Sequence, residues 1–333
     1  MKIKTRKRNL KFVALVACAV LVVCGSLMIA HAIRQRQQWE PADADVSRPE
    51  LDTSVTYNGK TYTPKEDLET ILLMGLDKYQ KDTEQFGYLN DQQADFLLLL
   101  VLDEKTKTAN LLHLNRDTMT EITRLGVGGG EADRFTGQLA LAHTFGSGGS
   151  DSCLNTVKAV SKLLGGIRIQ HYVSITMDAV ATLNDLVGGV TVTIQDNFSQ
   201  VDPTLVQGTE VRLKGEQALT YVRVRRNMED SSNLARMERQ RQYMQAFYEQ
   251  LMKCCNTDPS FFEKNYVKVA EYVQTDCTIY QLQSLTEGME QYQLDTIYTL
   301  DGNTQKGEEF MEFYPDKDSI SNVILNLFYE PAA

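Results

Sequence analysis

Arginine side chains gather in one short segment of a chain that is otherwise rich in acids. Of the twelve arginines that follow residue 36, six lie within nineteen residues: Arg223, Arg225, Arg226, Arg236, Arg239 and Arg241. The planar guanidinium group binds two oxygens of a phosphate or a carboxylate at once. So dense a cluster in an acidic background predicts a local anion site rather than a basic surface.

The spacing within the segment indicates how these groups are presented. Arg236, Arg239 and Gln240 are spaced i, i+3 and i+4, which places them on one face of a helix. Arg223 and Arg225 precede them at i, i+2 spacing, which can aim two guanidinium groups at one point. The alternative is a solvated helix face whose arginines pair with the neighbouring acids Glu229, Asp230 and Glu238.

Two aspartates stand at the ends of apolar runs that are typical of buried strands. Asp77 follows the run 70–76, and Asp95 precedes the run 96–102. Carboxylates at the strand ends of an α/β sheet lie where ligands usually bind. Two of them together can hold Mg²⁺ or Mn²⁺, hard cations that prefer oxygen ligands and bind phosphates. The alternative is that each aspartate only caps a turn.

An Arg-Asp pair follows a third apolar run, 108–114. Arg116 can clamp a phosphate, and Asp117 can orient the guanidinium group or act as a base. The alternative is a buried structural ion pair. Several arginines together with two or three aspartates have the composition of a pyrophosphate–metal site.

Other kinds of site find little support. The chain has no GxxxxGK[ST] loop and no GxSxG elbow, which excludes the commonest nucleotide-binding and hydrolase motifs. The glycine-rich stretches 126–130 and 146–149 are interpreted as mobile loops. No CxxC pair or Cys/His cluster along the sequence suggests zinc. The spacing leaves open a disulfide bond from Cys277 to Cys254 or Cys255.

The N-terminus predicts a membrane anchor. Six of the first eleven residues are Lys or Arg, and residues 12–30 carry no charge. We expect a cytoplasmic tail (1–11), a transmembrane helix (12–33) and an extracytoplasmic remainder on a single-pass membrane protein. A cleaved signal peptide is the alternative, because residues 30–32 read Ala-His-Ala. Residues 37–333 hold 26 basic and 44 acidic side chains, a net charge of −18, so no nucleic-acid partner is expected.

The exported part reads as a stalk, 34–68, with a hairpin turn at Asn58-Gly59, followed by one α/β domain, 69–333. Strands are expected at 70–76, 96–102, 108–114, 170–175 and 190–194, and helices at 151–164, 177–187, 214–224 and 233–253. Later segments predict helices at 259–274, 278–291 and 319–329 and strands at 296–300 and 312–314. Strands that alternate with helices favour a three-layer α/β/α sandwich around a central mixed sheet.

These motifs resemble those of the LytR-CpsA-Psr family of bacterial cell-envelope proteins. The blocks that carry the resemblance occur in family order: ILLMGLD (71–77), ADF (94–96), LNRDTM (114–119), LVGGVTV (186–192), LKGEQALTYVRVR (213–225) and NLARMERQRQYM (233–244). They cover a motif core of about residues 69–250, in addition to the anchor. The last two blocks, at this spacing, are highly specific.

The resemblance implies a function and a role for each site residue. Family members transfer a glycopolymer, such as teichoic acid or capsule, from undecaprenyl pyrophosphate to peptidoglycan or another envelope acceptor with the help of magnesium. Asp77 and Asp95 would then be metal ligands, and Arg116 and Asp117 would act with them in catalysis. The groups implied to bind the pyrophosphate are Arg116, Arg223, Arg225, Arg236 and Gln240. Two alternatives share this site: a lipid pyrophosphate hydrolase, and a non-catalytic regulator that binds polyprenyl phosphates.

Two positions depart from the family pattern. Many members have an aspartate three residues before the helix arginine, where this chain has Asn233. Asp230 lies close by in the sequence and is assigned as the third metal ligand in its place. The usual proline before the Arg-Asp pair is Asn115 here.

Overall fold

The computed structural model describes residues 54–77, 92–126, 128–258, 261–278, 281, 291–308 and 310–332. The predicted tail (1–11), the predicted anchor (12–33) and residues 34–53 of the predicted stalk lie outside the described residues, as does most of the predicted helix 278–291. Within the described part, no helix is long and apolar enough to cross a membrane.

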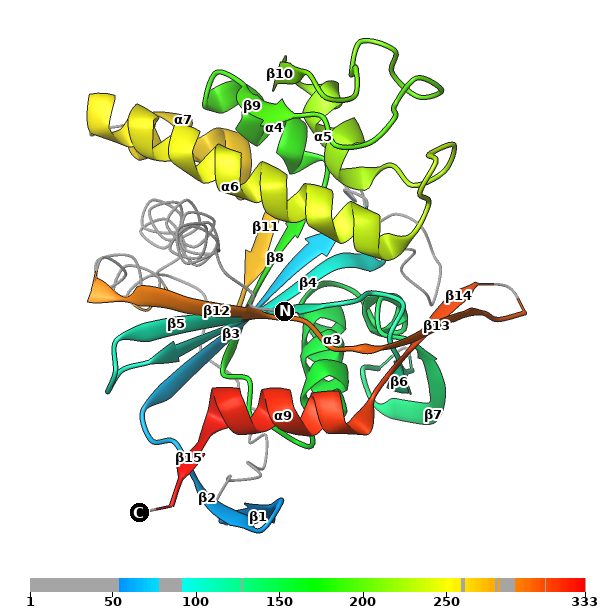
Figure 1. Cartoon of the computed structure of the whole chain (residues 1–333), viewed down its shortest axis with the longest axis vertical. Helices are drawn as coiled ribbons and strands as arrows, with labels where there is room; N and C mark the ends of the chain where they lie inside the picture. Colours follow the sequence, from blue (N-terminus) through cyan, green and yellow to red (C-terminus); the bar gives the residue numbers. More distant parts are fainter. Residues whose placement is uncertain are drawn as a thin grey trace, which may run out of the picture.

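A six-stranded mixed sheet forms the centre of the fold (Figure 1). In spatial order its strands are β11 (Val273–Thr275), β8 (His171–Thr176), β3 (Leu68–Leu76), β4 (Ala94–Asp103), β5 (Thr108–Leu114) and β12 (Gln293–Tyr298). Two neighbouring pairs, β3–β8 and β5–β12, are parallel, and the other three pairs are antiparallel. The predicted mixed α/β fold with a central mixed sheet is therefore confirmed.

The two longest strands are apolar on both faces, as the continuous runs predicted. Leu72 and Met74 pack into one core cluster, and Ile71 and Leu73, which alternate with them, pack into the other. This alternation follows from the period of two along a strand. A strand covered on both sides must be flanked by two layers of other elements.

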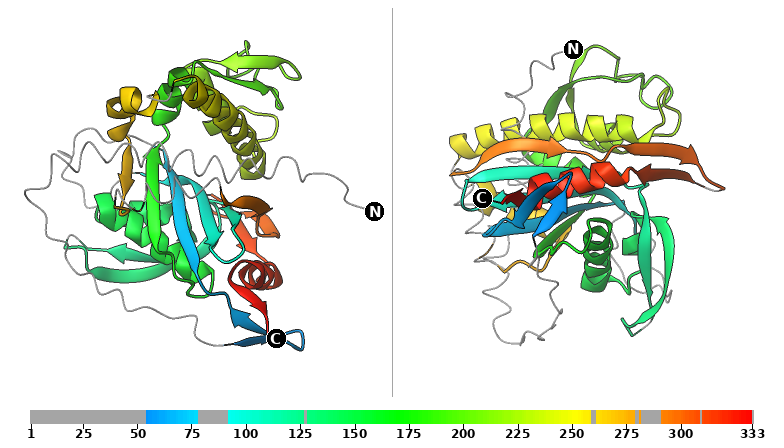
Figure 2. Two further views of the ribbon diagram at one scale, coloured as in Figure 1. Left: turned by 90° about the vertical axis from the view of Figure 1, so that its left-hand side faces the viewer. Right: turned by 60° about the horizontal axis from the view of Figure 1, so that its bottom comes forward.

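Helices supply those two layers (Figures 1 and 2). One face of the sheet packs against α3 (Gly149–Leu163) and α9 (Lys317–Phe328), with the short α2 (Leu141–Thr144) beside them. The other face lies beneath the long α6 (Asn233–Thr257). Three further helices pack around α6: α4 (Ala179–Leu186), α5 (Glu216–Arg223) and α7 (Phe261–Ala270).

Four small sheets surround this centre. The hairpin β1 (Val55–Tyr57) and β2 (Lys60–Pro64) turns at Asn58-Gly59, where both residues have positive φ, and β2 also pairs with the C-terminal β15 (Tyr329–Pro331). Residues 55–64 of the range predicted as a stalk thus belong to the folded domain. The other sheets are three hairpins: β6 (Met119–Leu125) with β7 (Glu131–Gln138), β9 (Val190–Thr193) with β10 (Glu210–Leu213), and β13 (Gly302–Lys306) with β14 (Met311–Pro315).

Some local predictions need correction. No strands were predicted on either side of the glycine-rich stretch 126–130, but the flanking residues form the β6–β7 hairpin, and the Gly126 N–H donates to the Gly130 carbonyl at 2.8 Å. The predicted helix 259–274 ends at Ala270, because the chain then joins the sheet as β11. All four cysteines of the described part are free thiols, so the possible bond from Cys277 to Cys254 or Cys255 is absent.

Candidate functional site

Asp95 lies at the centre of a buried cluster of charged side chains. It is the second residue of β4, and its two carboxylate oxygens bind different guanidinium groups. Arg116, just beyond β5, pairs with Oδ1, and Arg236, in the first turn of α6, pairs with Oδ2 at 3.0 Å. Three sequence blocks far apart in the chain therefore meet at one end of the sheet.

Positive charge exceeds negative charge in this cluster. Arg225 lies 3.5 Å from Asp117 Oδ2, and Arg116 Nε lies 3.4 Å from Asp117 Oδ1. Three guanidinium groups thus face two carboxylates. Burial lowers the pKa of Arg236 to about 10, and the nearby charges of Arg225 and Arg116 also lower it, against the opposing effect of Asp95. Arg236 remains protonated at neutral pH, in a site where an added anion would reduce the repulsion.

Neutral side chains hold the cluster in place. Arg116 donates to Gln93 Oε1, and Arg236 donates to Asn233 Oδ1 at 2.6 Å. Asn233 donates in turn to Asn115 Oδ1 at 2.7 Å. The two departures from the family pattern, Asn115 and Asn233, therefore contact each other directly.

Asp117 is the most enclosed acid of the site. Gln138 of β7 donates to its Oδ1 at 3.1 Å, and the backbone N–H of Phe313 in β14 donates to its carbonyl oxygen at 2.9 Å. Burial raises the pKa of Asp117, while Arg116, Arg225 and Arg236 partly oppose that rise. A carboxylate with a raised pKa is a stronger base than an ordinary aspartate.

Asp77 lies beside this cluster, whereas Asp230 lies on the surface. The Gln93 N–H donates to Asp77 Oδ1 at 2.8 Å, and the Gln93 side chain accepts from Arg116. Gln93 thus links Asp77 to the cluster. Asp230 is exposed in the segment before α6 and accepts a hydrogen bond from the Ser232 N–H. The described carboxylates of Asp77, Asp95 and Asp230 do not form a group of three whose ligand atoms lie within 4.8 Å of one another.

The donor set of Asp77 and Asp95 fits magnesium as a partner of a phosphate ligand. Mg²⁺ commonly takes only one or two protein carboxylates and completes its shell with water and substrate phosphates. Each carboxylate oxygen has two lone pairs, so the guanidinium contacts of Asp95 leave acceptor capacity. The metal-binding role of all three aspartates stays a prediction.

An apolar pocket lies between α6 and the sheet. It encloses about 840 Å³ of empty space, including the solvent at its mouth. Its walls come from β3, β4, β8, α4, α5, α6 and the residues next to them: Leu73, Met74, Gly75, Phe96, Val173, Ile175, Thr176, Met177, Val180, Leu183, Val222, Gln240, Tyr243, Met244 and Phe247. Only Thr176, Gln240 and the Tyr243 hydroxyl are polar among these side chains, and a lining of this composition suits an apolar ligand.

Gln240 connects the pocket to the arginine cluster. It lines the pocket one helical turn after Arg236, and its Nε2 donates to the Val222 carbonyl at 3.2 Å. Its Oε1 is buried without a hydrogen-bond partner, and so is Arg236 Nε. Buried polar atoms without partners are costly, and at a binding site a ligand often supplies the missing contact.

Three other arginines of the segment differ in their surroundings. Arg223 ends α5 directly after the pocket residue Val222 and is half-buried, and its side chain makes no hydrogen bond or ion pair with another described residue. Arg239 is buried and binds Asp196 and the carbonyls of Tyr221 and Val224, at the end of α5, which makes it a structural residue. Arg241 pairs with Glu238, as the alternative of a solvated face predicted.

Comparisons of sequence and structure relate the chain to known proteins. The model of the LytR_cpsA_psr family matches residues 32–327. TagU of Bacillus licheniformis, a polyisoprenyl-teichoic acid–peptidoglycan teichoic acid transferase, is 23% identical over 331 residues, which cover 98% of each chain.

Solved structures share the fold. The crystal structure of B. subtilis TagV is 25% identical and gives a TM-score of 0.57 over 79% of this chain and 96% of that one. TagT bound to LIIa-WTA, at 22% identity, gives a TM-score of 0.55 over 85% of this chain and 97% of that one. The family match spans most of the sequence and includes every block that forms the site. The chain therefore belongs to the LytR-CpsA-Psr family.

Proposed function

We propose that this protein transfers a glycopolymer from a polyprenyl pyrophosphate carrier to peptidoglycan or another envelope acceptor. The observation that carries the proposal is the junction at Gln240, where an apolar pocket meets a buried cluster with excess positive charge. A lipid pyrophosphate has the matching parts, an apolar tail and an anionic head. The transferase name of the full-length relative supports the same assignment.

The pocket accounts for the lipid. An isoprenoid chain offers only apolar contacts, and the pocket walls are apolar apart from three side chains. Gly75 contributes to this fit, because a side chain at that position would approach Phe96 Cβ to 2.9 Å and disturb the wall. Burial of the tail would supply affinity in rough proportion to the apolar area removed from water.

The arginines account for the pyrophosphate. Arg116, Arg225 and Arg236 already surround the two carboxylates of the cluster, and Arg223 has no competing partner among the described residues. Bidentate guanidinium contacts would bind the phosphate oxygens and stabilise the charge of the leaving polyprenyl phosphate. Mg²⁺ held by Asp77 and Asp95 would supply further neutralisation of phosphate charge.

The reaction is an attack by an acceptor sugar hydroxyl on the phosphorus nearest the glycan. A phosphodiester forms between acceptor and glycan, and the bond between that phosphorus and the bridging oxygen breaks. Polyprenyl phosphate departs with that oxygen. We assign the hydroxyl proton to Asp117, because its pKa is raised and its contacts with Arg116 and Arg225, at 3.4 and 3.5 Å, are longer than the guanidinium contacts of Asp95. Catalysis is then mainly positioning and charge stabilisation.

We also propose a location for the protein at the cell membrane. The uncharged segment 12–30 and the basic residues before it would anchor the chain in the cell membrane, with the domain outside. An anchored enzyme meets a lipid-linked substrate at a higher effective concentration than a free one.

One experiment separates the proposal from its alternatives. Purified full-length protein is incubated with lipid-linked glycan, Mg²⁺ and peptidoglycan, and the products are separated. Polymer bound to peptidoglycan is the expected result. Free glycan phosphate would indicate a hydrolase, and binding without turnover would indicate a regulator; either outcome refutes transfer.

A matched pair of variants tests the site in the same assay. Arg223→Ala is expected to reduce turnover about a hundredfold, the effect of one lost charge-stabilising contact. Arg226→Ala, which removes a neighbouring exposed arginine, is expected to leave turnover unchanged. Equal activity of the two variants would remove Arg223 from the assigned site.

A further inference from the structure

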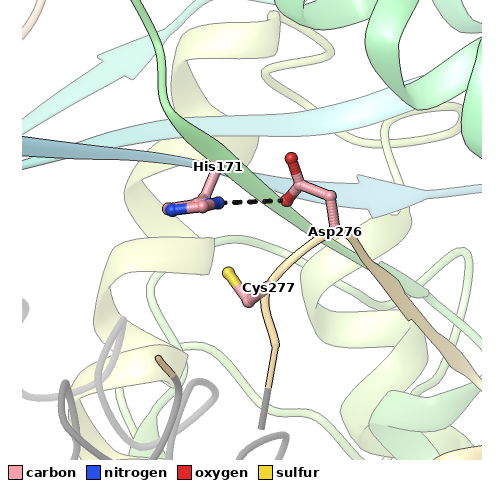
Figure 3. A group of neighbouring side chains, drawn as sticks. All are labelled: His171, Asp276 and Cys277. Carbon is pink, nitrogen blue, oxygen red and sulfur yellow. Dashed lines mark ion pairs between the residues drawn. The ribbon is translucent and has the colours of Figure 1, made fainter. Parts of the chain in front are cut away.

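Figure 3 shows a second group of neighbouring side chains of the types that bind metals: His171, Asp276 and Cys277. His171 opens β8, and Asp276 and Cys277 follow directly after β11. Because β8 and β11 are antiparallel, with Thr275 opposite Val173, the continuing chain brings Cys277 toward His171. The backbone partner of His171 in β3 is Ile71, five residues from the strand end near Asp95, or roughly 17 Å along a strand.

The atoms of this group have the separation of metal ligands. One ligand atom from each of His171, Asp276 and Cys277 lies within 4.8 Å of the other two. His171 Nδ1 is 3.6 Å from Asp276 Oδ1, too long for a hydrogen bond, and Nδ1 is buried without a hydrogen-bond partner. Tetrahedral zinc with ligand bonds of about 2.0–2.2 Å separates N and O ligands by roughly 3.4 Å.

We propose that His171, Asp276 and Cys277 bind one Zn²⁺ ion, with water as the fourth ligand. A thiolate, an imidazole and a carboxylate are the three ligand types that zinc sites use. The thiolate disfavours Mg²⁺ and Ca²⁺, which require oxygen ligands. The side chain of Asp276 is 32% exposed, which gives the ion a path from solvent, whereas Cys277 is buried.

Neighbouring groups already orient two of these ligands. The Tyr172 N–H donates to Asp276 Oδ1 at 2.9 Å, and the Cys277 N–H donates to the Thr275 hydroxyl at 3.0 Å. Such contacts fix ligand direction in metal sites.

Gln281 sets one condition on the proposed site. Its Nε2 lies 2.8 Å from His171 Nε2, while its Oε1 accepts from the Thr278 N–H and hydroxyl. If Nδ1 binds zinc, the ring proton lies on Nε2. The Gln281 amide must then turn its oxygen to the ring and give up the Thr278 contacts.

The proposed ion would join segments that are about a hundred residues apart in the sequence. It would tie the start of β8 to the chain after β11, at one edge of the central sheet. Metal binding to the folded state alone stabilises that state. The role is structural, and its test does not depend on the transferase proposal.

The test measures zinc binding to the full-length protein after removal of metal by a chelator. We expect one Zn²⁺ per chain by elemental analysis and calorimetry. Zinc at about a hundred times its dissociation constant should raise Tm by roughly 5 °C. Co²⁺ in place of zinc should give a thiolate-to-cobalt charge-transfer absorption.

Variants assign the ligands. Cys277→Ser should abolish the cobalt absorption, whereas Cys255→Ser, which changes a thiol elsewhere, should retain both metals. Asp276→Asn should weaken zinc binding at least about tenfold. If Cys277→Ser does not fold, this variant and the wild-type cobalt spectrum together test the ligand assignment. Wild-type protein without stoichiometric zinc, or a cobalt–thiolate band that survives in Cys277→Ser, would overturn the proposal.

Discussion

Arg236 and Arg239 lie one turn apart on α6 and are equally hidden, with 2% and 1% of their surfaces exposed, but their surroundings differ. The guanidinium group of Arg239 is enclosed by good partners. It pairs with Asp196, donates to the carbonyls of Tyr221 and Val224, and lies over the ring of Phe198 at 5.6 Å. Each of the three guanidinium nitrogens of Arg239 therefore donates a hydrogen bond to the protein itself.

Arg236 is only partly satisfied. It shares Asp95 with Arg116, its Nε has no hydrogen-bond partner, and Arg225 adds a further positive charge nearby. The comparison shows that burial and pairing alone do not distinguish a structural arginine from a ligand-binding one. The distinguishing features are unbalanced charge and unused donors.

The strongest test of this difference is the stability of two variants in which methionine replaces one of these arginines. Arg239→Met should lower the free energy of unfolding by about 3–5 kcal/mol, because Asp196 and two carbonyls lose a buried partner. Arg236→Met should cost no more than about 2 kcal/mol, since Asp95 keeps Arg116 and a like-charge repulsion disappears. Denaturant unfolding measures both. Equal losses would contradict the distinction.

When lysine replaces each arginine, turnover should fall more at Arg236 than at Arg239, the opposite of the order expected for stability. Lysine keeps the charge but loses the planar fork of donors. Arg236→Lys should lower the transfer rate by two to three orders of magnitude, in the range of a lost transition-state contact. Arg239→Lys should stay within about tenfold of wild type at a temperature where circular dichroism shows both variants folded. A larger loss in Arg239→Lys would place that residue in the reaction rather than in the scaffold.

The sequence predicted the charged members of the site but not their partners. Asp95, Arg116 and Arg236 could be named because strand ends and helix spacing are local features. Gln93 and Gln138 were not named, and Asn233 was named only as a departure from the family pattern, because a neutral amide does not by itself indicate a charged partner. Their contacts join residues 23, 21 and 118 positions apart, so they depend on strand register and helix placement.

The same limit applies to the fold. The strands around Leu72 and Leu99 were evident because both faces are buried and the runs are continuously apolar. The β6–β7 hairpin was missed because both strands are polar and the connection is rich in glycine. The approach of His171 to Cys277 likewise depends on the pairing of β8 with β11, which spacing along the chain cannot show.

The pH dependence of stability and turnover tests the role proposed for Asp117. Its raised pKa means that the folded state binds the proton more tightly than the unfolded state does. Between the usual pKa of an aspartate and this raised value, rising pH should therefore reduce stability while it increases turnover. Asp117→Asn should remove both pH dependences and lower the rate about a hundredfold. A wild-type rate that is constant across this range would refute Asp117 as the base.

The smallest expected effect concerns Asn233, where many relatives of this family have an aspartate. In Asn233→Asp, the bond from Arg236 would gain charge, but the donor to Asn115 Oδ1 would be lost and two acceptor oxygens would face each other. These changes oppose each other, and each is worth about 1–2 kcal/mol, so stability should change by less than about 1 kcal/mol. Asn115→Ala should have the larger effect, because Asn115 also accepts from the Asp117 N–H at 2.9 Å. If Asn233→Asp instead destabilises the protein strongly, the amide donor is essential to the cluster. In that case the asparagines at 115 and 233 act as a pair, and a carboxylate at 233 requires a different residue at 115.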